Sequence, residues 1–260
     1  MSTPPRTLNE LFFGAMDRSA SRPVAMRVKR GGTWVGTSFA DLLSQVQAFS
    51  IGLHELGVNA GDRLAILSEN RPEWAVTDFA CLACRCADVP VYPTLPAHQI
   101  EYILRDSGAV AVCCSSAAQL GKILEIRGNL PALKTIVVFD ADAATGGAIT
   151  FESVLAKGRA AIPKYPTWRA DALAVKPDDL ATLIYTSGTT GDPKGVMLTH
   201  GNITSDVVAG LQVLDLRQSD ECLSFLPLSH IFERMAGHYC MTQQGAIINY
   251  ATSIESVPIE

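Results

Sequence analysis

The chain alternates short apolar runs with longer segments in which apolar residues recur every three or four positions. Short apolar runs are typical of buried strands, whereas the longer spacing is typical of helices that bury one face. The runs predict strands at residues 24–28, 33–37, 63–67, 89–92, 109–114, 135–139, 180–186, 195–199, 222–226 and 246–250. The helical spacing predicts helices after Thr7, Ser38 and Asn70, and at residues 97–106, 116–126, 151–157, 202–214 and 231–243.

Residues suited to capping stand where three of the N-terminal helices should begin. Thr7 is followed three residues later by Glu10, which makes a capping box. Ser38 precedes the second helix, and Asn70 is expected to cap the third, which has Pro72 in its first turn. The starts of these helices are therefore predicted by capping as well as by periodicity.

The order of strands and helices predicts an α/β fold, because parallel strands need a crossover that is usually a helix. We expect two βαβ-type subdomains with mostly parallel sheets and helices on both faces. The first should span residues 1–161 and the second residues 180–260. Residues 162–179 hold three prolines and a tryptophan, and are expected to form an irregular connector.

Composition narrows the classes of function. The 260 residues are 48% hydrophobic and 18% charged, which is ample for a packed core, and the formal net charge of −5 argues against a nucleic-acid surface. Seven irregularly spaced cysteines, and an N-terminus without a basic segment before its apolar residues, point to the reducing cytosol. No apolar run reaches the ~18 residues that a membrane span needs. We expect a cytoplasmic protein with at most peripheral membrane contact.

One strongly polar stretch separates the strands predicted at 180–186 and 195–199, both expected to be buried. It consists of small, hydroxyl-bearing and charged residues: Thr186, Ser187, Gly188, Thr189, Thr190, Gly191, Asp192, Pro193, Lys194 and Gly195. Glycines let a backbone approach a ligand closely, and successive N–H groups in such a loop form an anion-binding concavity. With its hydroxyl donors and the charge of Lys194, the loop predicts a phosphate site rather than an ordinary hairpin.

The spacing of this loop is not that of a Walker A motif, which needs Gly, four residues, then Gly-Lys-Ser/Thr. Pro193 stands five residues after Gly188, and Val196 stands five residues after Gly191, so the second glycine of that motif is missing in both registers. The alternative to phosphate binding is a mobile surface loop with a solvated lysine.

The stretch YTSGTTGDPKG at residues 185–195 resembles the signature of the adenylate-forming acyl-CoA synthetases, the AMP-binding superfamily that includes firefly luciferase and peptide-synthetase adenylation domains. LPLSHIFER at residues 226–234 resembles the next motif, in the form seen in long-chain fatty-acid–CoA ligases. YATSIESVP at residues 250–258 is also similar to the long-chain subgroup. In layout the resemblance covers the whole chain from SENRPEW at residues 68–74 onward.

The resemblance implies an ATP-dependent ligase that activates a fatty acid in two half-reactions. The carboxylate attacks the α-phosphorus of ATP to give acyl-AMP and pyrophosphate, and the thiol of coenzyme A then displaces AMP. Family members continue into an adenine-binding motif, a metal-binding glutamate and a mobile C-terminal domain. Tyr-Gly-x-Thr-Glu does not occur here, and Thr-Gly-Asp occurs only inside the phosphate loop, at residues 190–192. We therefore expect an incomplete N-terminal portion that is inactive alone, binds Mg²⁺ and coenzyme A poorly, and self-associates through a sheet edge left after residues 247–250.

The resemblance also implies roles for single residues. Seven residues match family positions at the phosphates of ATP: Thr186, Ser187, Gly188, Thr189, Thr190, Gly191 and Lys194. Lys194 would be catalytic, because a cation there stabilises the charge that develops on departing pyrophosphate. Thr186 would share Mg²⁺ with the downstream glutamate. His230 would act beside the acyl carboxylate, and its alternative is a helix-capping or satisfied core histidine.

The remaining candidates are expected to be structural. Glu233 and Arg234 share a helix face with His230, so an internal ion pair is expected. Five cysteines fall on an apolar helix and a strand and are expected to be buried core thiols rather than zinc ligands: Cys81, Cys84, Cys86, Cys113 and Cys114.

Two other functions stay open. A phosphate loop does not separate a fatty acid from another acyl or aryl acid, since it binds phosphates and not the acyl chain. The chain could also be a non-catalytic protein that binds a nucleotide or an acyl group.

Overall fold

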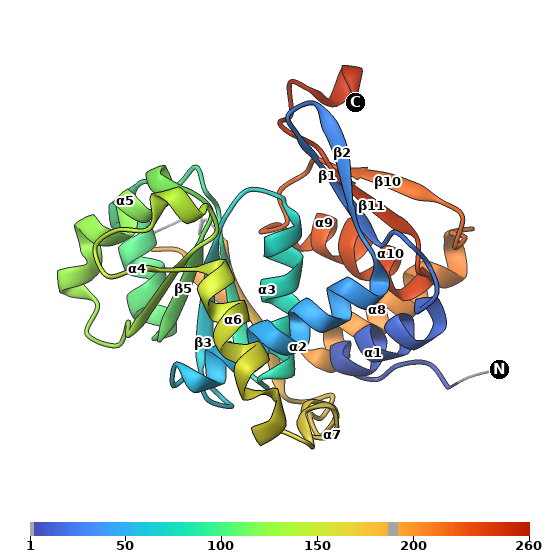
Figure 1. Cartoon of the computed structure of the whole chain (residues 1–260), viewed down its shortest axis with the longest axis horizontal. Coiled ribbons are helices and arrows are strands. Elements are labelled where there is room, and N and C mark those ends of the chain that lie inside the picture. Colours follow the sequence, from blue (N-terminus) through green and yellow to red (C-terminus); the bar gives the residue numbers. More distant parts are fainter. Residues whose placement is uncertain (1–2, 187–191) are drawn as a thin grey trace.

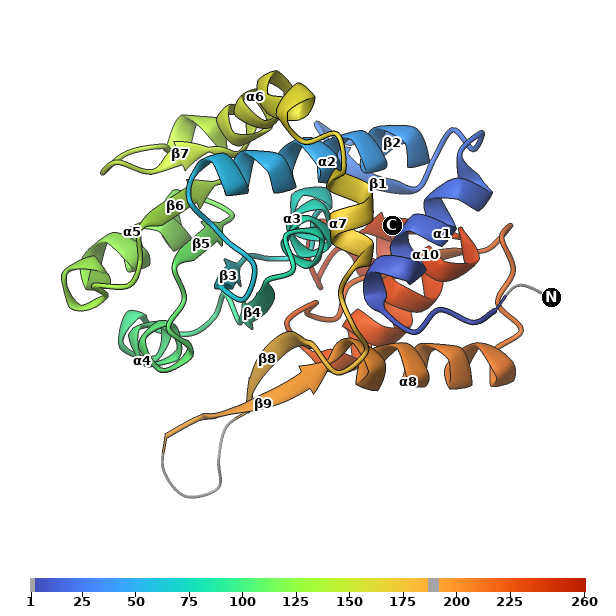
Figure 2. The same ribbon diagram turned by 90° about the horizontal axis from the view of Figure 1, so that it is seen from below.

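The computed structural model describes residues 3–186 and 192–260, which form two β-sheets with helices packed on them (Figure 1, Figure 2). The larger sheet has seven strands in the order β7-β6-β5-β3-β4-β8-β9, and the smaller has four in the order β10-β11-β1-β2. Neighbouring strands are parallel except in the pairs β1–β2 and β8–β9. The predicted α/β class with mostly parallel sheets is confirmed.

The larger sheet comprises β3 (Arg63–Leu67), β4 (Ala87–Val91), β5 (Ala111–Cys114), β6 (Thr135–Val138), β7 (Ile149–Thr150), β8 (Leu180–Thr186) and β9 (Lys194–Thr199). The smaller comprises β1 (Met26–Arg30), β2 (Thr33–Thr37), β10 (Glu221–Ser224) and β11 (Ile247–Tyr250). The helices are α1 (Leu8–Ser19), α2 (Phe39–Glu55), α3 (Pro72–Ala83), α4 (Ala97–Ser107), α5 (Ala117–Ile126), α6 (Phe151–Ala161), α7 (Trp168–Leu173), α8 (His200–Val213), α9 (Ile231–Glu233) and α10 (Met241–Gln244), with a π-helix at Arg234–Cys240.

Helices cover both faces of the larger sheet, because side chains along a strand point alternately to its two faces. Leu64 and Ile66 of β3 belong to one core with α2, α3 and α6, whereas Ala65 and Leu67 belong to a second core with α4 and α5. Figure 2 shows α4 and α5 on one side of this sheet and α2 and α3 on the other. The strand therefore needs apolar residues at every position, as its sequence has.

Each sheet combines strands from both predicted subdomains. β1, which follows the first helix, pairs with β11 near the C-terminus, and β8 joins β4 of the larger sheet. The boundaries predicted at residues 161 and 180 therefore do not coincide with the division between the sheets. Residues 162–179 also contain α7, whose Trp168 Nε1 donates to Ser50 Oγ at 2.7 Å, so this connector is partly helical.

One strand and one sheet edge differ from their predictions. β9 was expected to be buried, yet Val196 and Met197 are 43% and 65% exposed, because β9 is an edge strand paired only with β8 among the described residues. β8 and β9 form an antiparallel hairpin, with Thr186 opposite Lys194. The edge expected after residues 247–250 is also misplaced, since β11 lies between β10 and β1, and the edges of that sheet are β10 and β2.

No helix among residues 3–186 and 192–260 combines the length and apolarity that crossing a membrane requires.

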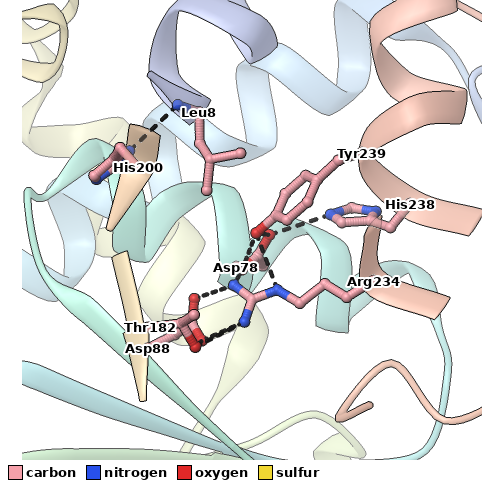
Figure 3. A network of polar contacts seen from close by, with 8 residues as sticks. All are labelled: Leu8, Asp78, Asp88, Thr182, His200, Arg234, His238 and Tyr239. Carbon is pink, nitrogen blue, oxygen red and sulfur yellow. Dashed lines mark hydrogen bonds and ion pairs between the residues drawn. The ribbon is translucent and has the colours of Figure 1, made fainter. Parts of the chain in front are cut away.

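A buried contact joins the starts of two helices. His200, the first residue of α8, is completely buried, and its Nδ1 accepts a hydrogen bond from the backbone N–H of Leu8 at 3.3 Å (Figure 3). This contact joins the start of α8 to the start of α1. Burial lowers the pKa of His200 to about 4, because a charged imidazolium would be desolvated.

Acid should therefore destabilise the fold through His200. The pKa of this group is lower in the folded chain than its ordinary value of 6.5. Between these two pH values the unfolded chain binds a proton that the folded chain does not, so the free energy of unfolding falls as pH decreases from about 6.5 to 4. The loss should be roughly 2–3 kcal/mol, at ~1.4 kcal/mol for each unit of pKa shift. Urea unfolding at pH 4.5 and 7.0 measures it.

Two variants separate this group from the other acid-sensitive ones. His200→Asn keeps an acceptor near the Leu8 N–H but does not titrate in this range, so its stability should depend less on pH than that of the wild type. His98→Asn, at an exposed position on α4, is the matched control and should keep the wild-type dependence. Equal pH dependence in wild type and His200→Asn would contradict the assignment.

Candidate functional site

A groove of about 430 Å³ lies at the carboxyl ends of β4 and β8. Thr186 and Pro193, from the ends of the phosphate loop, line it together with His230 of the second motif. Its other walls are mostly apolar residues from β4, the segment between β4 and α4, α4, β8 and α9, among them Pro90, Leu95, Ile103, Ile184 and Ile231. Ligand sites in parallel sheets gather at this end of the strands, so two distant segments with predicted site residues meet where a site is expected.

The β8–β9 hairpin positions the two ends of the predicted phosphate loop. Thr186 is the last residue of β8 and Lys194 the first of β9, and both are exposed. The other five predicted phosphate-binding residues lie outside the described part of the chain: Ser187, Gly188, Thr189, Thr190 and Gly191. Thr186, which lines the groove, and Lys194, which does not, are thus held opposite each other by strand pairing.

His230 stands at a turn, where it caps a helix and also lines the groove. Its Nδ1 accepts from the backbone N–H of Phe232 at 3.2 Å, and its side chain is exposed. Because Nδ1 is the acceptor of this bond, Nε2 is the nitrogen left for a ligand. His230 can therefore cap the helix through Nδ1 and still offer Nε2 to a ligand in the groove, so the two interpretations of this residue do not exclude each other.

Asn70 fixes the turn that carries His230. Its Nδ2 donates to Leu226 O at 2.7 Å, and its Oδ1 accepts from the N–H of Leu228 at 2.9 Å. The prediction that Asn70 caps α3 is wrong, because Arg71 is the N-cap residue and makes no side-chain capping bond. A side-chain amide has both a donor and an acceptor, so Asn70 can hold a remote turn by two backbone groups at once.

Sequence reasoning missed the groove residues on β4, α4 and the end of β8. Tyr92 and Gln99 line the groove, as does Tyr185, whose hydroxyl donates to Asp106 Oδ2 at 2.6 Å. Burial and this hydrogen bond raise the pKa of Tyr185, so the hydroxyl stays protonated. Tyr185 adjoins the phosphate loop and could have been noticed there. Gln99 follows an amphipathic pattern that any core-packed helix would share.

A buried ionic cluster joins α3, β4, β8 and the helix after His230 (Figure 3). Arg234 is completely buried, and it forms ion pairs with Asp78 of α3 and Asp88 of β4. Its Nη1 donates to Asp88 Oδ1 at 2.8 Å and to Thr182 Oγ1 at 2.9 Å, and its Nε donates to the Tyr239 hydroxyl at 3.0 Å. Nη2 donates two further hydrogen bonds, one to Asp78 and one to Asp88. The guanidinium has five N–H groups, so every one of them has an acceptor.

The expectation of an ion pair between Glu233 and Arg234 is wrong. Glu233 instead accepts from Ser224 Oγ at 2.6 Å, and burial raises its pKa. The helix after His230 is a π-helix from Arg234 to Cys240, and a π-helix bonds residue i to i+5. That wider turn brings Arg234, His238 and Tyr239 onto one side, where they converge on Asp78.

The two buried carboxylates titrate differently. Burial disfavours the charged form of both, but Arg234 and His238 outweigh burial at Asp78 and lower its pKa. At Asp88, burial and the neighbouring Asp78 charge outweigh Arg234 and raise the pKa to about 7. Two carboxylates that share one guanidinium cannot both ionise freely, so near neutral pH the cluster holds little net charge.

Removing the Arg234 guanidinium should leave two buried carboxyl groups without their cation. We expect Arg234→Met to lower the free energy of unfolding by roughly 3–5 kcal/mol, the scale for removing one partner of a buried ion pair. Arg27→Met is the matched control, since Arg27 pairs with Glu221 at the surface, and it should cost under about 1 kcal/mol. Urea unfolding of both variants gives the comparison, and equal losses would show that the buried cluster contributes no more than a surface pair.

Four of the five cysteines expected in the core are buried there, whereas Cys84 is half-buried. Cys81, Cys86, Cys113 and Cys114 are completely buried, and burial raises the pKa of Cys113 well above its ordinary value. Thiols that stay protonated are poor metal ligands. Among residues 3–186 and 192–260, His, Cys, Asp and Glu side chains form no group of three or more that could hold a metal ion.

The model of the family described as AMP-binding enzyme matches residues 14–258, so the chain belongs to that family. A long-chain-fatty-acid–CoA ligase of Mycobacterium tuberculosis is 37% identical over 205 residues, which are 78% of this chain and 33% of the relative. A peroxisomal long chain acyl-CoA synthetase of Arabidopsis thaliana is 34% identical over 249 residues, or 88% of this chain and 33% of the relative. The chain thus spans about a third of the length of these relatives.

Solved structures share the fold. A long-chain-fatty-acid-CoA ligase from Archaeoglobus fulgidus has a TM-score of 0.81 at 18% identity, over 98% of this chain and 49% of that chain. An anthranilate CoA ligase in complex with anthranoyl-AMP has a TM-score of 0.78 at 22% identity, over 96% of this chain and 45% of that chain. The fold is therefore that of the N-terminal domain of adenylate-forming enzymes.

Proposed function

We propose that this chain is the N-terminal part of an ATP-dependent long-chain fatty-acid–CoA ligase, which converts a fatty acid, ATP and coenzyme A to acyl-CoA, AMP and pyrophosphate. The observation that supports it most is the groove in which Thr186 and His230, from two separate motifs, face one volume beside apolar Ile103 and Ile184. The groove thus offers polar groups for a carboxylate and phosphates next to apolar groups for an acyl chain. Two relatives from different organisms carry this activity in their names.

In the first half-reaction, a carboxylate oxygen bonds to the α-phosphorus of ATP, and the bond to pyrophosphate breaks. Residues 186–191 and Lys194 would hold the phosphates, and Lys194 would neutralise the charge that builds up on the departing group. His230 would hydrogen-bond the carboxylate or the acyl-adenylate through Nε2. In the second half-reaction, the thiol of coenzyme A displaces AMP, and groups for coenzyme A would come from the rest of the enzyme.

Magnesium fits these residues only in part. Thr186 offers one neutral oxygen, whereas Mg²⁺ in such sites binds carboxylates and substrate phosphates with near-octahedral geometry. Bound Mg²⁺ would neutralise phosphate charge, with Thr186 as one ligand and a glutamate from beyond this chain as another. This part alone should bind the metal weakly.

A different acid is the second candidate for the substrate, because the anthranilate CoA ligase shares the fold with this chain. The phosphate loop serves either acid, so the choice depends on the groove. Pyrophosphate release by the full-length protein with palmitate or with anthranilate separates the two. A non-catalytic nucleotide- or acyl-binding protein would bind one of these ligands but release no pyrophosphate with either.

Two finer proposals concern location and association. We propose a cytoplasmic protein that contacts membranes peripherally, where fatty acids partition, and vesicle sedimentation tests this membrane contact.

We also propose that the isolated chain self-associates through β9, an edge strand with exposed Val196 and Met197. Light scattering should show a mass above that of one chain at high concentration, and Met197→Lys should restore the monomer. A monomer for the wild type at every concentration would contradict it.

The 260-residue chain should make no acyl-CoA by itself, since it spans only a third of its relatives. Purified chain would be incubated with ATP, Mg²⁺, palmitate and coenzyme A, beside a reaction without protein. Thioester above that background would show that this part is sufficient for the reaction.

Lys194→Ala in the full-length enzyme should lower kcat for pyrophosphate release by roughly 10²–10³, the scale for losing one preorganised donor. The KM for fatty acid should change little, because Lys194 would contact phosphate and not the acyl chain. Stability should change by under about 0.5 kcal/mol, as for other exposed positions. Lys176→Ala, also exposed but outside the β8–β9 hairpin, is the control and should leave kcat unchanged. Unchanged release in Lys194→Ala would remove this lysine from the mechanism.

A further inference from the structure

The buried cluster around Arg234 connects the walls of the groove. Asp88 of β4 and Thr182 of β8 lie opposite each other in the sheet, and Thr182 Oγ1 donates to Asp88 Oδ1 at 2.8 Å. Arg234 reaches both strands with one nitrogen, since its Nη1 donates to Asp88 and to Thr182. The side chain of one residue thus connects the helix after His230 to two neighbouring strands (Figure 3).

One wall of the groove lies on the same face of the sheet as the cluster, whereas Tyr185 and the α4 residue Ile103 line the groove from the other face. Side chains along a strand alternate between faces, so Asp88 shares a face with Pro90, and Thr182 shares one with Ile184 and Thr186. Pro90, Ile184 and Thr186 line the groove. The Arg234 contacts therefore lie further along the same strand faces, toward the amino ends of β4 and β8.

The backbone of Arg234 is hydrogen-bonded to His230. The backbone N–H of Arg234 donates to His230 O at 3.2 Å, which is one helical turn. Ile231, between them, lines the groove with His230. A shift of Arg234 relative to β8 would therefore shift His230 relative to Thr186.

Arg234 is not itself a group that touches a substrate. It is completely buried, and protein acceptors occupy all of its N–H groups. Any effect of this residue on a reaction in the groove must therefore act through the groups that it holds.

We infer that Arg234 is a positioning residue that fixes the distance between the turn carrying His230 and the end of β8 carrying Thr186. The contact with Thr182 is the part that holds β8, whereas the contact with Tyr239 lies within the helix of Arg234 itself. The expected effect on kcat rests on the proposed function, whereas the expected effect on the position of the turn that carries His230 does not.

Two single-atom variants separate positioning from stability. Thr182→Val removes the hydroxyl that joins Arg234 to β8 and keeps the shape of the side chain. Tyr239→Phe removes a hydroxyl that accepts from the same guanidinium and donates to Asp78 of α3, but that bonds to neither strand. Both positions are completely buried. Thr182→Ser keeps the hydroxyl and is the rescue variant.

The first readout is amide hydrogen exchange in the 260-residue chain. The N–H groups of Phe232 and Arg234 are bonded to His230, so their exchange reports on this turn. Exchange at these two amides should be roughly tenfold faster in Thr182→Val than in Tyr239→Phe, because only the first detaches the helix from β8. Thr182→Ser should exchange like the wild type. Equal exchange in the valine and phenylalanine variants would overturn the inference.

The second readout is pyrophosphate release by the full-length protein with ATP and palmitate. Thr182→Val should lower kcat by roughly 10–100-fold, since misplacing a catalytic group by an ångström has effects of this size, whereas Tyr239→Phe should stay within about threefold. A loss in Thr182→Val that appears only in KM, or an equal loss of kcat in both variants, would also overturn it. If the wild type releases no pyrophosphate, the proposed function fails, and hydrogen exchange alone decides whether Arg234 positions the turn.

Discussion

A guanidinium that is removed from water needs an acceptor for each of its N–H groups, and this requirement at Arg234 shapes the middle of the molecule. The acceptors come from α3, β4, β8 and the helix of Arg234 itself. Four elements must therefore keep one relative arrangement. Because an unpaired buried charge is so unfavourable, the larger sheet, the helices on it and the segment after His230 form one unit.

The groove depends on that unit. Thr186 and His230 are exposed, and the buried contacts of Arg234 with β8 and with the helix after His230 set their relative position. Asn70 adds a second attachment, because it binds the backbone on the near side of His230 at Leu226 and Leu228. A rigid base under exposed polar groups is the arrangement expected of a site that binds a flexible, charged substrate.

Most of the local structure could be predicted from the sequence, and most of the long-range pairing could not. Periodicity located β3, β5 and α4, because each buries a regular set of apolar residues. It did not predict that β8 pairs with β4, since strand order depends on contacts between distant residues. It also misjudged β9, because a short apolar run looks the same in an edge strand and in a buried one.

Side-chain partners were the least predictable feature of the site. The spacing of Glu233 and Arg234 suggested a mutual ion pair, but the π-helix turns Arg234 toward carboxylates on α3 and β4. Those carboxylates, Asp78 and Asp88, stand in apolar stretches where nothing in the local pattern marks them. Phosphate-loop residues were easier to recognise, because their chemistry is carried by consecutive positions.

The pairing of β1 with β11 has a consequence for biosynthesis. Met26 of β1 lies beside Ile248 of β11, although most of the chain separates them in sequence. A ribosome releases the N-terminal hairpin long before its parallel neighbour, so the nascent chain carries β1 with one open side during translation. Closing so large a loop is slow, and the exposed strand can meet other nascent chains in that interval.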